Sequence, residues 1–204
     1  MTYAPTVVTE LREIAGRYPQ ARSGMLPMLH LLQSYDGCIT QAGLEACAEI
    51  LDVTTAEVAA VATFYSMYKT KPVGKHLVGV CTNTLCAVMG GDLIYERLQE
   101  HLGGNESADG AVTLEHVECN AACDYAPVVM VNWEFFDDQT PESAVELVDA
   151  LRAGETVTPT RGAELTCWRD VERVLAGFED GRADEGPSAG AASLAGLVKS
   201  RESD

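Results

Sequence analysis

The sequence lacks several features that would assign it to a common class of protein. No apolar run approaches the ~18–20 residues needed to span a bilayer, and the N-terminal residues Met-Thr-Tyr-Ala-Pro lack the charged-then-apolar order of a secretory signal. Nothing resembles a nucleophile with its base, a Walker loop or a dinucleotide fingerprint. We therefore expect a cytoplasmic protein with no direct membrane insertion and no substrate site of its own.

Basic residues are also few. The 204 residues include 14 Lys and Arg against 31 Asp and Glu, a net charge of −17. From Asp92 to Ala150, fourteen acidic residues stand against the single basic residue Arg97. We expect no nucleic-acid partner, because phosphate binding needs clustered Lys and Arg. The acidic stretch is either a solvated surface, or a surface that docks to a basic partner or tunes a nearby redox centre.

What the sequence does contain is two close pairs of cysteines. Cys81 and Cys86 are separated by four residues, and Cys119 and Cys123 by three. Each pair follows a run with strand character and precedes a turn, so two short loops can bring four sulfurs to one metal centre. In a cytoplasmic protein, close pairs indicate metal or redox chemistry more often than disulfides. We predict a [2Fe–2S] cluster held by these four cysteines.

Other uses of the four cysteines stay open at this point. A zinc site in a structural adaptor is one, since zinc accepts about two to four residues between the cysteines of a pair. A disulfide oxidoreductase is another, but its Cys-x-x-Cys motif does not occur here. No histidine accompanies either pair, which argues against a Rieske-type centre. We expect the remaining cysteines, Cys38, Cys47 and Cys167, to pack as small apolar residues.

The first part of the chain, residues 1–70, has helical periodicity in four segments, which predicts a small N-terminal helical bundle. The last of these helices opens with a capping box formed by Thr54 and Glu57. We expect the aromatic side chains of residues 64–68 in the core of the bundle or at its border with the next domain. Pro72 and Gly74 mark a linker.

The second part, residues 75–152, has the pattern strand, helix, strand, strand, strand, helix. This order predicts an α/β domain of the thioredoxin-like type, with both cysteine pairs in loops just beyond strand ends. The strands are expected at 76–80, 112–118, 127–131 and around Phe135, and the helices at 93–102 and 140–151. Gly90 and Gly91 are expected to mark the start of a helix.

The third part, residues 153–204, is predicted as an extended C-terminal tail with one short helix at 166–175. Its Gly- and Ala-rich stretch after residue 181 is too poor in apolar residues to fold alone. A strap across a neighbouring protein chain and a disordered linker are both open. The strap would use five spaced apolar anchors: Trp168, Val174, Leu175, Phe178 and Leu194. On this prediction, deletion of residues 160–204 leaves the cluster intact.

The cysteine spacing resembles that of a known family. Together with Ala62-Thr-Phe-Tyr-Ser66, the linker Pro72-Val-Gly-Lys75 and Ala126-Pro127-Val-Val, it resembles the small [2Fe–2S] subunit, the E type, of NADH:quinone oxidoreductase (respiratory complex I). The resemblance spans about residues 8–152. It implies a thioredoxin-like fold behind a helical bundle, and it implies that Cys81, Cys86, Cys119 and Cys123 are the cluster ligands.

The resemblance also implies an electron-carrier role in a larger complex. FMN and NADH are then expected on a partner subunit, beside a large iron–sulfur subunit, in a peripheral assembly on the cytoplasmic side of the membrane. A similar module in NAD-linked formate dehydrogenases and hydrogenases remains an alternative. The sequence departs from the family at Val112, where Phe is common, and at Asn120-Ala121, where Leu-Gly is common. These departures concern the hydrogen bonds that help set the cluster potential, not ligation.

Overall fold

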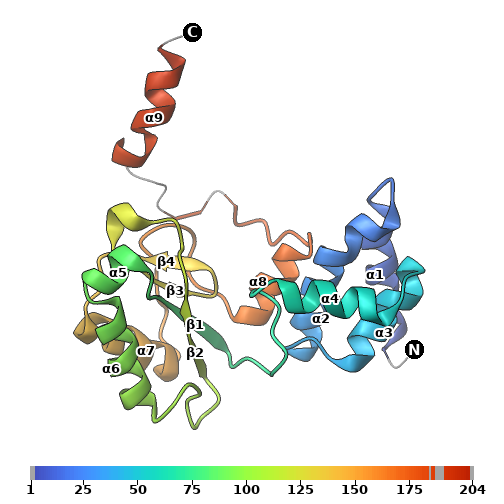
Figure 1. Ribbon diagram of the computed structural model, residues 1–204, viewed down its shortest axis with the longest axis horizontal. Helices are drawn as coiled ribbons and strands as arrows, with labels where there is room; N and C mark the ends of the chain where they lie inside the picture. Colours follow the sequence, from blue (N-terminus) through green and yellow to red (C-terminus); the bar gives the residue numbers. More distant parts are fainter. Residues whose placement is uncertain (1–2, 184, 187–190, 203–204) are drawn as a thin grey trace. The chain divides into compact units, whose positions relative to one another are not determined.

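The structure, a computed structural model, describes residues 3–183, 185–186 and 191–202. The chain divides into two compact units (Figure 1). The helical unit comprises Met1–Leu77, Glu106–Thr113 and Thr166–Asp180, and the sheet unit comprises Val78–Asn105, Leu114–Leu165 and Gly181–Asp204. Within the described residues, no helix is long and apolar enough to cross a membrane.

The helical unit contains the four helices expected within residues 1–70 and two further helical segments. Its elements are α1 (Pro5–Gly16), η1 (Ala21–Gly24), α2 (Met25–Asp36), α3 (Gln41–Leu51), α4 (Thr55–Phe64) and α8 (Trp168–Leu175). Gly37 ends α2 in the left-handed conformation, with φ 78°, and donates its N–H to the Gln33 carbonyl. The predicted capping box of Thr54 and Glu57 at the start of α4 is confirmed.

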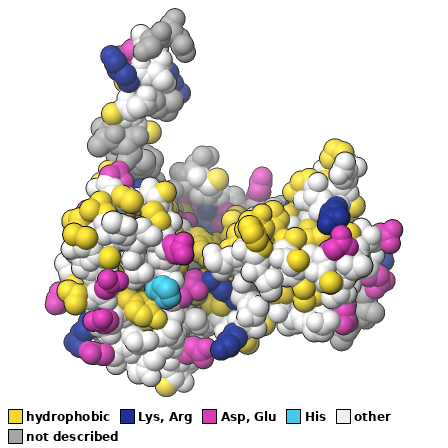
Figure 2. Space-filling view, viewed as in Figure 1, with side chains coloured by type: hydrophobic (Ala, Val, Ile, Leu, Met, Phe, Trp, Pro, Cys, Tyr) yellow, Lys and Arg dark blue, Asp and Glu magenta, His cyan; other side chains and the backbone are white. Residues whose placement is uncertain are grey.

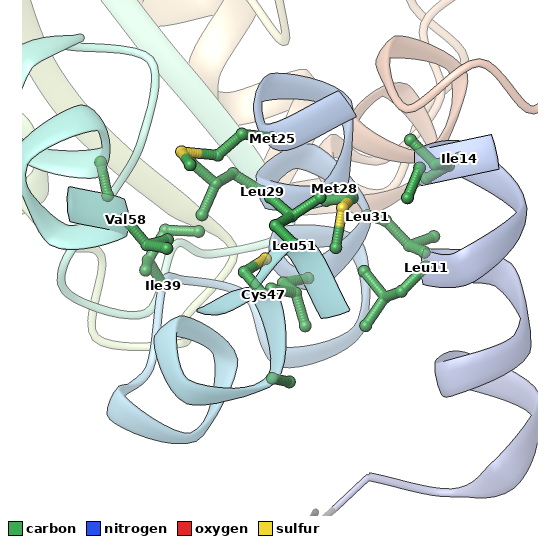
Figure 3. Close-up of a cluster of buried hydrophobic side chains, with 14 of the residues drawn as sticks. Leu11, Ile14, Met25, Met28, Leu29, Leu31, Ile39, Cys47, Leu51 and Val58 are labelled. Atoms are coloured by element: carbon green, nitrogen blue, oxygen red, sulfur yellow. The ribbon is translucent and has the colours of Figure 1, made fainter. Parts of the chain in front are cut away.

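The apolar faces of these helices form the core of the helical unit, where Leu11, Met28 and Leu29 are fully buried (Figure 3). Cys47 lies in this core as predicted, and burial raises the pKa of its thiol to about 12. The prediction for the aromatic residues is only partly right. Tyr68 is buried, but Phe64, the last residue of α4, is 79% exposed.

Helix α8 is where the structure departs most from the sequence prediction. Trp168 and Glu172 are fully buried, and α8 packs against α2. The Oε2 atom of Glu172 accepts a hydrogen bond of 2.7 Å from Gln33 Nε2. Residues 166–180 are therefore part of the helical unit's core and do not extend away as a tail. Their partners in α2 lie about 140 positions earlier in the sequence, out of reach of any local pattern.

The sheet unit is organised around four strands in the order β2-β1-β3-β4. Its elements are β1 (His76–Cys81), α5 (Thr84–Val88), α6 (Gly91–Leu102), β2 (Val112–Val117), η2 (Cys123–Tyr125), β3 (Val129–Val131), β4 (Glu134–Phe136), α7 (Pro141–Ala153) and α9 (Ala191–Arg201). The first two residues of β1 and of β2 are counted with the helical unit. Strand β3 is antiparallel to β1 and to β4. Strands β1 and β2 are parallel, since His76 N–H bonds the Ala111 carbonyl and Thr82 N–H bonds that of Val117.

These elements match the predicted α/β order, with two additions. Helices α6 and α7 pack against each other (Figure 1), and His101 Nε2 lies 2.7 Å from Asp149 Oδ1 between them. Helix α5 was not predicted, because five residues are too few to show a helical period. Helix α9 was not predicted either. Residues 184, 187–190 and 203–204 of the predicted tail lie outside the described residues.

Candidate metal centre

The four cysteines of the predicted site lie at the ends of neighbouring elements of the sheet unit. Cys81 is the last residue of β1, and Cys86 lies in α5, whose first turn is capped by Asn83 Oδ1 at 2.9 Å from Thr84 N. Cys119 lies in the loop after β2, and Cys123 begins η2. The β1–α6–β2 crossover thus brings both pairs to one end of the sheet, as predicted for loops that follow parallel strands.

The sulfurs of these cysteines interact both within and between the pairs. Cys119 Sγ lies 3.9 Å from Cys123 Sγ, and a side-chain hydrogen bond joins Cys81 to Cys86. A charge on Cys81 raises the pKa of Cys123, and a charge on Cys123 raises that of Cys86. The two pairs are therefore close enough for their charges to influence each other.

The surroundings of Cys86 and Cys123 raise the pKa of both thiols and so favour their protonated form as long as no cation is present. Burial raises the pKa of Cys86 to about 11; the hydrogen bond with Cys81 adds to the rise and one with the Val128 backbone opposes it. The pKa of Cys123 is raised chiefly by its hydrogen bond with Cys119 and by the charge of that residue. A bound metal reverses this preference, since a coordinated thiol gives up its proton.

The arrangement of the thiols fits a two-iron cluster, in which each iron takes two protein ligands. Two sulfurs bound tetrahedrally at ~2.3 Å from one metal are about 3.8 Å apart, close to the 3.9 Å between Cys119 and Cys123. In the part of the chain that the structure describes, no three His, Cys, Asp or Glu side chains converge on a site for a single metal ion. The thiols are grouped as two pairs.

The two pairs differ in their exposure. Cys81 and Cys86 are 2% exposed and pack with three apolar residues, Ala122, Ala126 and Val128. Cys119 and Cys123 are exposed. The Cys81 thiol donates to the Glu118 carbonyl at 3.2 Å, and the Ala121 N–H lies 3.4 Å from Cys119 Sγ. A group held here would have one side in the apolar interior and one side at the surface.

Gly91 is a residue of this site whose role was missed from the sequence. A Cβ atom at this position would lie 2.9 Å from the Cys86 carbonyl oxygen and closer still to that of Cys81. Only glycine therefore lets the first turn of α6 approach the backbone of both buried cysteines. A signal was present, because a Gly-Gly pair follows Cys86 by four residues, but such a pair is equally typical of the start of a helix.

The other cysteines lie outside this centre. Cys38 is buried in the helical unit, as predicted. Cys167 is only partly buried, and its thiol donates to Asp170 Oδ2 at 2.9 Å. Neither cysteine belongs to the sheet unit.

Comparison with known proteins assigns the chain to a family. Residues 11–152 match the family model of the thioredoxin-like [2Fe–2S] ferredoxins. The chain belongs to this family. Its members are thioredoxin-like [2Fe–2S] ferredoxin domains by name. The α/β, thioredoxin-like fold predicted from the sequence is thereby confirmed, and the family name supports an iron–sulfur cluster. The match ends at residue 152, one residue before the end of α7.

Full-length relatives carry a more specific name. The chain is 59% identical, over 211 aligned positions, to the E subunit of NADH-quinone oxidoreductase from Mycobacterium tuberculosis (strain ATCC 25618 / H37Rv), covering all of this chain and 84% of that protein. It is 34% identical to the E 2 subunit of NADH-quinone oxidoreductase from Rhizobium meliloti (strain 1021), covering 78% of this chain and 96% of that protein. This thioredoxin-like ferredoxin is therefore a homologue of the E subunits of NADH-quinone oxidoreductase.

Among solved structures, the chain is similar to one in the crystal structure of an NAD⁺-reducing [NiFe]-hydrogenase in the air-oxidized state. The TM-score is 0.56 at 20% identity, and the match covers 64% of this chain but 23% of the hydrogenase chain. At this identity the likeness concerns the fold alone.

Proposed function

We propose that this chain is the electron-carrier subunit of an NADH:quinone oxidoreductase, with one [2Fe–2S] cluster held by Cys81, Cys86, Cys119 and Cys123. The observation that carries the proposal is the placement of these four thiols as two pairs at one end of the sheet, inside a domain of the [2Fe–2S] ferredoxin family. Such a cluster accepts and donates single electrons when bound.

The protein's own residues would shield the cluster on one side and open it on the other. Cys81 and Cys86 hold the buried side among apolar neighbours, which lowers the local polarity that helps set a potential. Cys119 and Cys123 bring the opposite side to the surface, where the redox group of a partner can approach. No nucleophile or base is needed for this role.

The expected partners are a flavin- and NADH-binding subunit, which carries the FMN, and a large iron–sulfur subunit. The name of the M. tuberculosis and R. meliloti relatives supports such an assembly. Exposed apolar side chains between the start of α5 and the first turn of α6 also support it, since they flank Cys86 in the sequence and exposed apolar patches mark interaction surfaces. Hydrophobic side chains are visible around this end of the sheet unit in Figure 2. The exposed apolar residues of this segment are Leu85, Val88, Met89 and Leu93, which are 43%, 82%, 54% and 61% exposed.

The same assembly would place the chain peripherally, on the cytoplasmic side of the membrane. The acidic side chains of the sheet unit are spread over its visible face (Figure 2) and do not gather in one patch, which suits a solvated surface of such a complex. The assembly itself is tested by co-purification. Membrane subunits and quinone-dependent NADH oxidation should accompany the tagged chain.

The cluster is tested on the full-length chain purified without oxygen. We expect two irons and two acid-labile sulfides per chain, a visible absorption spectrum, and an EPR signal on reduction. A colourless, EPR-silent protein with stoichiometric zinc would overturn the electron-carrier function in favour of a zinc-stabilised adaptor.

The alternative parent complex is a soluble NAD-linked hydrogenase or formate dehydrogenase. The fold of the chain, which is similar to that of a chain in an NAD⁺-reducing hydrogenase, is compatible with this alternative. Co-purification of a nickel- or molybdenum-containing subunit would decide for it.

A further inference from the structure

Residues 157–165, which lie outside the segment that matches the family model, fold back onto the edge of the sheet. The Thr160 N–H donates to the Phe135 carbonyl at 2.8 Å, and Phe135 and Arg161 form an isolated antiparallel bridge beside β4. The Leu165 N–H bonds the Val157 carbonyl at 3.1 Å. The segment was predicted to be tail, but it extends the sheet on the β4 side.

Arg161 is the residue that ties this segment to the interior. Its guanidinium pairs with Asp137 at 2.7 Å, and the Asp137 side chain is 8% exposed. It also lies 4.3 Å from the ring centroid of Phe135 and 5.4 Å from that of Tyr125. The Nε atom is buried and has no hydrogen-bond partner among the described residues. The charge of Arg161 is therefore balanced by one carboxylate and two aromatic faces.

Both aromatic residues are close to the cysteines, Tyr125 in the sequence and Phe135 through packing. Tyr125 is two residues after Cys123 in η2, and its carbonyl accepts the Asp138 N–H at 2.9 Å. Phe135 packs against the apolar cluster that contains Cys81 and Cys86. Arg161 thus contacts Tyr125, which follows Cys123 closely in the sequence, and Phe135, which packs against the apolar cluster that contains Cys81 and Cys86.

We propose that Arg161 is a positioning residue for the cluster: it holds the loop of Cys119 and Cys123 through Tyr125, and its charge offsets that of Asp137 beside the redox centre. This inference rests on the proposed [2Fe–2S] function. Reduction adds one negative charge to a cluster, so an unbalanced nearby anion opposes reduction and an unbalanced cation favours it. In the wild-type protein the opposite charges of Arg161 and Asp137 largely cancel.

The cancellation predicts shifts of opposite sign in a redox titration of the full-length protein followed by EPR. Arg161→Gln leaves Asp137 unbalanced, so we expect a more negative midpoint potential. Asp137→Asn leaves Arg161 unbalanced, so we expect a more positive one. The double variant should return towards the wild-type value, and Arg161→Lys, which keeps the charge, should stay near it.

The matched control is Arg97→Gln. Arg97 is on α6 of the same unit and is 56% exposed in a weak pair with Glu100 at 3.8 Å, so its loss should leave the potential unchanged. Shifts in the same direction for Arg161→Gln and Asp137→Asn, or no shift in either, would overturn the electrostatic role. Loss of the cluster in Arg161→Gln but not in Arg97→Gln would support the positioning role.

Hydrogen exchange of the metal-free protein gives a readout that does not need the cluster. We expect the amide of Asp138, which donates to Tyr125, to lose protection in Arg161→Gln and to keep most of it in Arg161→Lys. Unchanged protection would overturn the positioning role. A wild-type protein that binds no cluster would instead refute the proposed function. The exchange result would still test the contact of Arg161 with Tyr125.

Discussion

His30 Nδ1 and Glu172 Oε2 lie 2.6 Å apart, although 142 positions separate the two residues in the sequence. His30 is 6% exposed and Glu172 is fully buried, so this contact is closed off from water. Gln33 completes the arrangement: its Nε2 donates to Glu172, and its Oε1 accepts the Lys69 N–H at 2.6 Å. A C-terminal helix therefore holds the helical unit together through polar contacts at its centre.

The first prediction follows from this arrangement. Replacement of Trp168 by Ala should lower the free energy of unfolding of the helical unit by about 3–5 kcal/mol, because it empties a fully buried site. Val174→Ala on the same helix is the matched control, since Val174 is 37% exposed and should cost less than about 1 kcal/mol. Urea denaturation of the metal-free protein measures both. Equal effects would show that α8 does not belong to the core.

The contacts of α8 with the helical unit also predict how truncation of the chain affects the stability of this unit. Removal of residues 181–204 keeps α8 and residues 157–165, and we expect it to leave the stability of the helical unit unchanged. Removal of residues 160–204 takes away Trp168, Glu172 and Arg161 together, and we expect it to destabilise the helical unit. The prediction from the sequence, that the cluster stays intact without these residues, is a separate outcome. Thermal melts of the two truncated chains compare them directly.

These differences show which parts of the protein its sequence reveals. The capping box of Thr54 and Glu57 and the two cysteine pairs are local patterns, in which spacing alone fixes the geometry. Glu172 in α8 could not be placed, because it reaches its partners only after the chain has folded. Arg161 was missed for the same reason. Its partners, Phe135 in β4 and Asp137 just after this strand, lie too far away in the sequence for a local pattern to pair them with Arg161.

The second prediction concerns pH and His76, at the start of β1. Burial, with a smaller effect from Lys75, lowers the pKa of His76 to about 4 in the folded state, against ~6.5 in an unfolded chain. Between these values the unfolded state binds more protons, so stability is full above pH ~6.5 and falls as the pH drops towards 4. We expect His76→Gln to remove this component, on the order of 1–3 kcal/mol.

The measurement is the unfolding midpoint of wild type and variant between pH 7 and pH 5. His116→Gln serves as control, because His116 is exposed on β2. Parallel pH curves for wild type and His76→Gln would contradict the burial of a neutral imidazole.

The third prediction concerns Gly91. Its replacement by Ala places a Cβ against the backbone carbonyls of Cys81 and Cys86, and backbone cannot yield as a side chain would. We expect the variant to lose about 1–3 kcal/mol of stability and to bind less iron after reconstitution. Gly16→Ala at the end of α1, where nothing lies within 4 Å of an added Cβ, should behave as wild type. A full iron content in Gly91→Ala would mean that α6 moves away without disturbing the cysteines.

The last prediction is that Cys81, Cys86, Cys119 and Cys123 are each needed for a normal cluster, whereas the cluster does not need Cys38, Cys47 or Cys167. Because Cys119 and Cys123 are exposed and Cys81 and Cys86 are buried, substitutions at the two exposed positions are easier to interpret as effects on the cluster alone. Serine at the buried Cys81 or Cys86 also places a hydroxyl among apolar side chains, which costs about 1–3 kcal/mol if it is unpaired. Serine at Cys119 or Cys123 is in contact with water, so the metal-free protein should keep its stability while the EPR spectrum of the reduced protein is lost or altered. A normal spectrum in Cys123→Ser, together with a lost one in Cys167→Ser, would show that the cluster is held elsewhere in the chain.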